Sequence, residues 1–124
     1  MEQPDASAWP ADKLAALRLG RRLVTEVAPA APGRRAFVDI RPVAVAADRD
    51  ARREGWTRAD RDRTFRLEHW DYDAGRIAGF DHDAGAVRVR ADVVVGEDRL
   101  GAALRAWGLR PAQFLHPWQT DDPQ

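Results

Sequence analysis

Residues 64–95 alternate between apolar and polar side chains, and two Asp-Ala-Gly triplets, at 73–75 and 83–85, interrupt the alternation. A period of two is typical of a half-buried β-strand, and glycine after aspartate suits a tight hairpin turn. The phrases WDYDAGRI (70–77) and FDHDAGAV (80–87) repeat this pattern. The sequence therefore predicts a three-stranded antiparallel meander over 64–95, with strands at 64–71, 76–81 and 86–95.

A fourth strand is predicted over residues 35–46, where the period of two appears again. Pro42 lies inside this run and has no backbone N–H to donate to a neighbouring strand. We therefore expect this strand to form an edge of the sheet or to contain a bulge.

Two helices are predicted outside the strands. The first begins at Pro10 and ends before Pro29, on an apolar set with helical spacing: Leu14, Leu17, Leu23, Val24 and Val27. The second spans residues 97–107 and ends at Gly108 as a left-handed cap. Each helix has one apolar stripe, so both are expected to pack on one face of the sheet. The predicted class is α+β, with an antiparallel sheet of about four strands.

The length of 124 residues is that of one domain, and we predict a single domain over 1–124. Its ends, 1–9 and 119–124, are polar and are expected to be loose tails. Residues 48–63 are rich in charges of both signs and have Trp56 as their only large apolar side chain. We predict a charged loop there, with room for a short helix before Gly55.

Composition excludes several classes of function. The 20 basic and 20 acidic residues cancel, whereas nucleic-acid binders concentrate positive charge, so no nucleic-acid partner is predicted. The chain has no cysteine, no apolar run near the roughly 20 residues that span a bilayer, and no secretory signal at its start. We expect a soluble cytoplasmic protein without a membrane partner. The abundance of alanine and arginine suggests a bacterial genome.

Motifs for catalysis or cofactor binding are absent from the sequence. It has no phosphate-binding loop, dinucleotide fingerprint or zinc-protease motif, and Ser7 is the only serine. The pairs Asp71-x-Asp73 and Asp81-x-Asp83 resemble the opening of a calcium loop, but glycine stands at the fifth position instead of the sixth. We therefore predict no cofactor and no metal.

The main functional prediction is a small non-catalytic module that binds another protein. Small α+β domains of this kind include toxin-neutralising, immunity-type proteins, which work by surface complementarity. The charged loop would match the partner's charge, and an aromatic anchor would provide a hot spot. The predicted contact residues are Trp56, Arg58, Asp60, Arg61 and Asp62 in the loop, with Asp71 and Asp73 at the first hairpin tip.

Two alternatives remain open. In the first, the chain is a small enzyme or ligand-binding domain, and His69, Asp71 and His82 line a pocket, because imidazole and carboxylate groups can share acid–base work. In the second, the chain is a structural homodimer built on the edge strand that contains Pro42.

Overall fold

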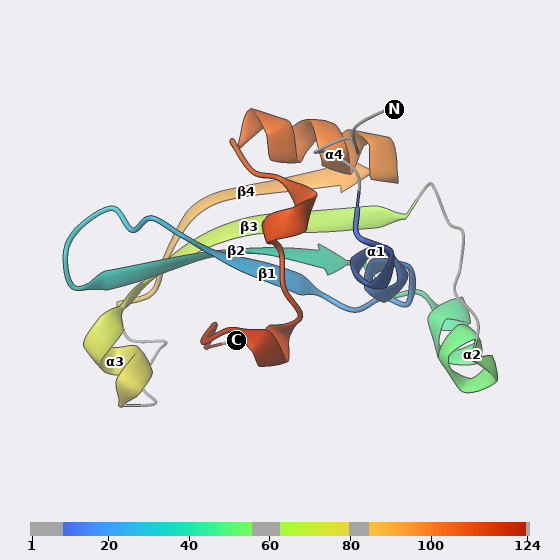
Figure 1. Cartoon of the computed structure of the whole chain (residues 1–124), viewed down its shortest axis with the longest axis horizontal. Coiled ribbons are helices and arrows are strands. Elements are labelled where there is room, and N and C mark those ends of the chain that lie inside the picture. Colours follow the sequence, from blue (N-terminus) through green and yellow to red (C-terminus); the bar gives the residue numbers. More distant parts are fainter. Residues whose placement is uncertain (1–8, 56–62, 80–84, 124) are drawn as a thin grey trace, which may run out of the picture.

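The computed structural model describes residues 9–55, 63–79 and 85–123, which form one sheet with helices around it (Figure 1). In chain order the elements are α1 (Ala11–Arg18), β1 (Leu23–Val27), β2 (Arg34–Pro42), α2 (Ala46–Glu54), β3 (Thr64–Asp73), α3 (Ala74–Ala78), β4 (Val87–Val95) and α4 (Glu97–Ala106). Two 3-10 helices follow, at Pro111–Gln113 and Pro117–Gln119. None of the helices described here is long and apolar enough to cross a membrane.

The predicted α+β class is confirmed. The four strands lie side by side in chain order, β1-β2-β3-β4, and every neighbouring pair is antiparallel. β2 and β3 pair along their whole length, from Arg34 opposite Asp73 to Pro42 opposite Phe65. The sheet is therefore a meander in which β1 and β4 are the outer strands.

The main core lies on the face of the sheet that we call the helical face. Its buried side chains from the strands include Val38, Ile40 and Leu67, and they pack in one cluster with Leu17 of α1 and Leu104 of α4. Burial of each such side chain contributes about 1.5–3 kcal/mol. Both helices thus cover the same face, as predicted. A smaller cluster of Val24, Phe37 and Tyr72 lies on the opposite face.

The N-terminal helix is shorter than predicted. α1 ends at Arg18, and Leu23, Val24 and Val27 lie in β1. Gly20 has a φ of +79°, a left-handed conformation that takes the chain out of the helix. The helical prediction for 23–27 was wrong because a short apolar run fits either period until its neighbours are known. Leu23 and Val24 are both fully buried, on opposite faces of the sheet.

The prediction of a strand over 76–81, in the middle of the meander, is also wrong. Residues 74–78 form α3, and Asp73 caps it by accepting a hydrogen bond from the Arg76 backbone N–H at 3.1 Å. The first Asp-Ala-Gly triplet is therefore a helix start, a role in which aspartate is as favourable as in a turn. β4 pairs with β3 instead, and β1 supplies the fourth strand. The second triplet lies outside the described residues except for Gly85.

β2 is an inner strand, so the prediction of an edge at Pro42 was wrong. The strand ends at Pro42 instead of continuing to residue 46, and Val43 donates one more backbone hydrogen bond, to Thr64, at 2.8 Å. A proline at the last position of an inner strand interrupts the ladder least. α2 (Ala46–Glu54) then forms the short helix for which the sequence left room before Gly55, so the prediction of a charged loop from residue 48 was wrong for its first seven residues, 48–54.

The C-terminal segment passes around the β1 edge (Figure 1). Leu115 exchanges two backbone hydrogen bonds with Val24, at 2.8 and 2.9 Å. Beyond this bridge, Asp122 pairs with Arg22 at 3.0 Å and Asp121 pairs with Arg35 at 3.2 Å. These contacts attach part of the segment that the sequence predicted to be a loose tail.

Candidate functional site

The predicted partner-binding loop is anchored at both of its ends. Asp48 and Arg63 form an ion pair in which each side chain is 2% exposed. Arg63 also donates to the backbone carbonyls of Val43 and Arg18, at 3.1 and 3.2 Å. The predicted contact residues Trp56, Arg58, Asp60, Arg61 and Asp62 lie between these anchors and outside the described residues, so their role stays a prediction.

The two aspartates predicted at the hairpin tip have internal partners. The Asp71 carboxylate pairs with Arg34, accepts the Ala30 backbone N–H at 3.3 Å, and is 4% exposed. Arg34 extends this link by donating to the Gly85 carbonyl at 2.9 Å. Asp73 caps α3. Both carboxylates therefore hold the end of β3 in place.

The alternative pocket is only partly within the described residues. His69 and Asp71 lie two residues apart on β3 and so share one face of the sheet, whereas His82 lies outside the described part. Burial lowers the pKa of His69, the neighbouring charge of Arg90 lowers it further, and Asp71 opposes both. Burial and Arg90 thus favour the neutral form of the imidazole. Among the described residues, no group of three or more side chains could hold a metal ion.

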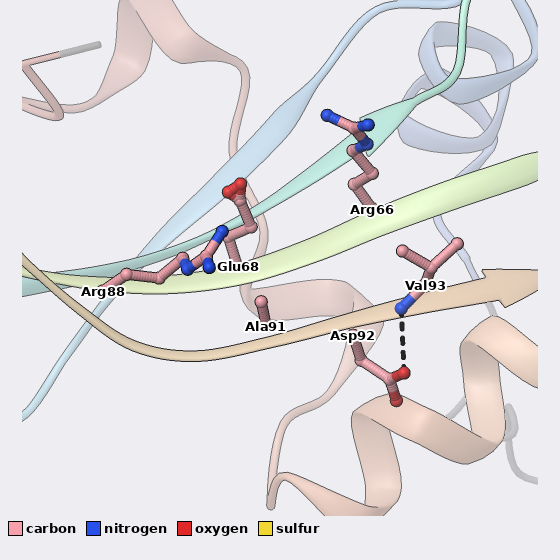
Figure 2. Close-up of a pocket in the computed structure, with 6 residues that line it drawn as sticks. All are labelled: Arg66, Glu68, Arg88, Ala91, Asp92 and Val93. Carbon is pink, nitrogen blue, oxygen red and sulfur yellow. Dashed lines mark hydrogen bonds between the residues drawn. The ribbon is translucent and has the colours of Figure 1, made fainter.

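A different site lies on the face of β3 and β4 opposite α4. Strand pairing places Glu68 opposite Ala91 and Arg66 opposite Val93, and directly opposed residues share a face. Figure 2 shows Arg66 and Glu68 pointing away from α4, whereas Asp92 points toward it. These residues line a shallow hollow of about 230 Å³: Arg66, Glu68, Arg88, Ala91, Asp92 and Val93. We call the members on this face, without Asp92, the β3–β4 patch.

The patch combines free positive charge with exposed apolar surface. In the described part of the chain, the guanidinium groups of Arg66 and Arg88 make no hydrogen bond or ion pair. Val93 is 61% exposed beside them. Trp70, next to the patch on β3, stacks on Tyr72 with ring centroids 6.3 Å apart and donates to Glu68 at 3.4 Å. The patch is therefore able to contact a surface that is both acidic and apolar.

The patch is not evident from the sequence, because the predicted meander pairs the strand at 64–71 with residues 76–81. In that pairing Arg66 and Arg88 lie on strands that are not neighbours. One part of the patch could have been found from the sequence. Arg66 and Glu68 are alternate polar residues of a strand, and alternate residues of a strand lie on the same face.

No protein-family model, no curated protein and no solved structure matches this chain. The function is therefore inferred from the geometry of the chain itself.

Proposed function

We propose that this protein is a small non-catalytic module that binds another protein through the β3–β4 patch. The observation that carries the proposal is the pair of guanidinium groups, Arg66 and Arg88, that have no hydrogen-bond or ion-pair partner among the described residues and flank exposed Val93. Arginine and tryptophan are enriched among the residues that dominate binding energy, and Trp70 lies beside this pair. The partner surface would present carboxylates around an apolar centre.

The patch fits a protein better than a nucleic acid. Glu68 lies between the two arginines, and its carboxylate would repel a phosphate backbone. The whole chain has no net charge, so no wider positive field would compensate for this repulsion.

A toxin-neutralising role is the most specific version of this proposal. It is supported by the small size and by a positive, partly apolar surface built on rigid strands. Such a protein would act by covering an acidic surface of its target.

Site-specific photo-crosslinking in the source cell tests the proposal. A photoreactive residue at Val93 should capture one defined protein, because this position lies within the patch. The same residue at Ala102, which is exposed on α4, is the control and should not capture it. Capture of the same protein from both positions, or from Ala102 only, would contradict the proposal.

The purified complex then gives a quantitative test. The double variant R66E/R88E should raise the Kd by more than about tenfold, since two hot-spot charges are reversed. The matched control R99E/R105E reverses two exposed arginines of α4 and should leave the Kd within about twofold. Equal effects of the two variants would mean that the response is to net charge and not to the patch. Loss of toxin activity on mixing would support the immunity-type version.

A further inference from the structure

The two edges of the sheet differ in their backbone partners. The chain's own Leu115 covers part of the β1 edge. The outer edge of β4 pairs with no strand in the described part of the chain. Gly96 N–H donates to the Arg63 carbonyl at 2.9 Å, toward β3, so strand alternation turns the backbone groups of Ala91, Val93 and Val95 outward. An edge of this kind is a template for another strand.

We propose that a second copy of this chain binds the β4 edge, with the two β4 strands antiparallel and centred on Ala91. The two four-stranded sheets would then form one continuous sheet. This inference does not rest on the proposed function, because it uses the edge of β4. The edge and the β3–β4 patch share Ala91 and Val93, so one copy would not use both surfaces in full at the same time.

Charge favours this register over the two registers that lie one residue away. In an antiparallel pair, two directly opposed residues both turn their backbone N–H and C=O groups toward the other strand, or both turn them away from it. Along the regular part of β4, the two opposed residue numbers are therefore both odd or both even. Centring on Ala91 places Arg90 opposite Asp92 of the partner copy, and the symmetry repeats this pair. Moving the centre by one residue places Arg90 opposite Arg90 or Asp92 opposite Asp92, and like charges in these positions are destabilising.

The same register brings exposed apolar side chains close to the junction. Val93 and Val95 are 61% and 49% exposed in the single chain, and they would lie beside the part of the partner copy that contains the β-bulge at Val89, so they form no directly opposed pairs. Any apolar area that is covered there would contribute about 25 cal/mol for each Å².

The central charges are already positioned for this pairing. The Arg90 guanidinium lies 4.0 Å from the ring centroid of Trp107, a cation–π contact that restrains it. The Asp92 carboxylate accepts the outward N–H of Val93 at 2.8 Å, as Figure 2 shows. Pairing of Ala91 with Ala91 of the partner copy would bring the Asp92 carboxylate close to the partner's Arg90, and Asp92 would leave the Val93 N–H to pair with it. The β-bulge between His69 and Trp70 leaves residues 90–92 in the regular part of the ladder.

Charge-exchange variants test the proposal by sedimentation velocity from low micromolar to submillimolar concentration. The wild-type chain should dimerise, and R90D or D92R alone should raise the dimer Kd by about tenfold, because each variant opposes like charges twice. Mixing R90D with D92R should restore association as a heterodimer, in which both opposed pairs again carry opposite charges. The control R53D reverses a charge that is 73% exposed in α2, and it should not change the Kd.

A wild-type chain that stays monomeric over this range would overturn the proposal, as would a dimer that responds equally to R53D and R90D. Hydrogen exchange of the wild-type chain keeps the proposal testable if a variant does not fold. The amide of Ala91 should exchange more slowly at high than at low protein concentration, and unchanged exchange would also overturn the proposal. The two proposals can fail separately, because the dimer is tested at Arg90 and Asp92, outside the β3–β4 patch, and the patch is tested at Arg66 and Arg88.

Discussion

At the scale of single residues, Gly20 and the buried Asp48 determine how the chain leaves α1. Gly20 ends α1 with a φ of +79°, and the buried Asp48 carboxylate lies against it. Asp48 in turn pairs with Arg63 and accepts the Val45 N–H at 3.0 Å. One aspartate thus connects the end of a helix to both ends of a long charged segment.

Alanine at Gly20 should destabilise the protein more than alanine at Gly33. Both glycines have a φ of +79°, so each variant pays the left-handed penalty of about 1–2 kcal/mol. A Cβ at Gly20 would also lie 3.0 Å from Asp48 Oδ2, whereas a Cβ at Gly33 meets nothing within 4 Å. Disturbing a buried ion pair should add at least about 1 kcal/mol for G20A. Urea denaturation measures both variants, and equal losses would contradict the role assigned to Asp48.

The His69 imidazole should make stability depend on pH. Its pKa in the folded chain is lowered, so the unfolded chain takes up a proton first as the pH falls through about 6.5. The free energy of unfolding should therefore decrease as the pH falls from about 7.5 to about 5.5. The variant H69Q should show a smaller decrease, with the other histidines as common background. An identical pH profile for H69Q and the wild-type chain would contradict this assignment.

At the scale of elements, short polar signals start and stop the helices while strand pairing defines the sheet. Asp73 ends β3 and caps α3, so one residue connects two elements of different period. The C-terminal helix α4 ends at Ala106, one residue before the predicted end at 107. Gly108 follows with a φ of +74°, the left-handed conformation that was predicted for it.

Removal of the α3 cap should have a measurable cost. D73A deletes the oxygen that accepts the Arg76 N–H, and loss of an N-cap costs about 1 kcal/mol. D73S retains an acceptor and should lose less than about 0.5 kcal/mol. Thermal unfolding compares the two variants. If D73S is as unstable as D73A, the side chain does not act as a cap.

At the scale of the whole molecule, ion pairs attach the C-terminal segment to residues far away in the sequence. Arg22 contacts both Asp39 and Asp122, and Arg35 contacts both Glu26 and Asp121. The segment reaches these arginines after it has bridged the β1 edge, so it covers part of both the edge and a face of the sheet.

The two C-terminal aspartates should differ in their contribution to stability. The Asp122 side chain is 3% exposed, so D122A removes a buried charged hydrogen bond that is worth about 1.5–3 kcal/mol. Asp121 is 74% exposed, and D121A should cost less than about 0.5 kcal/mol. Denaturant unfolding at low and high salt checks both values. Equal losses would mean that the segment is not held through Arg22.

Local patterns were sufficient to predict the class, the C-terminal helix and a strand over 64–71, which corresponds to β3, because a strong period or a clear cap acts over a few residues. The short run 23–27 and the triplet at 73–75 were misassigned, since their local signals fit two structures about equally well. The choice came from long-range contacts: β1 buries Leu23 and Val24 on opposite faces, and β3 takes β4 as its neighbour. That pairing brings Arg66 and Arg88 together in one patch. Local sequence patterns cannot specify this contact, because the two arginines lie far apart in the chain.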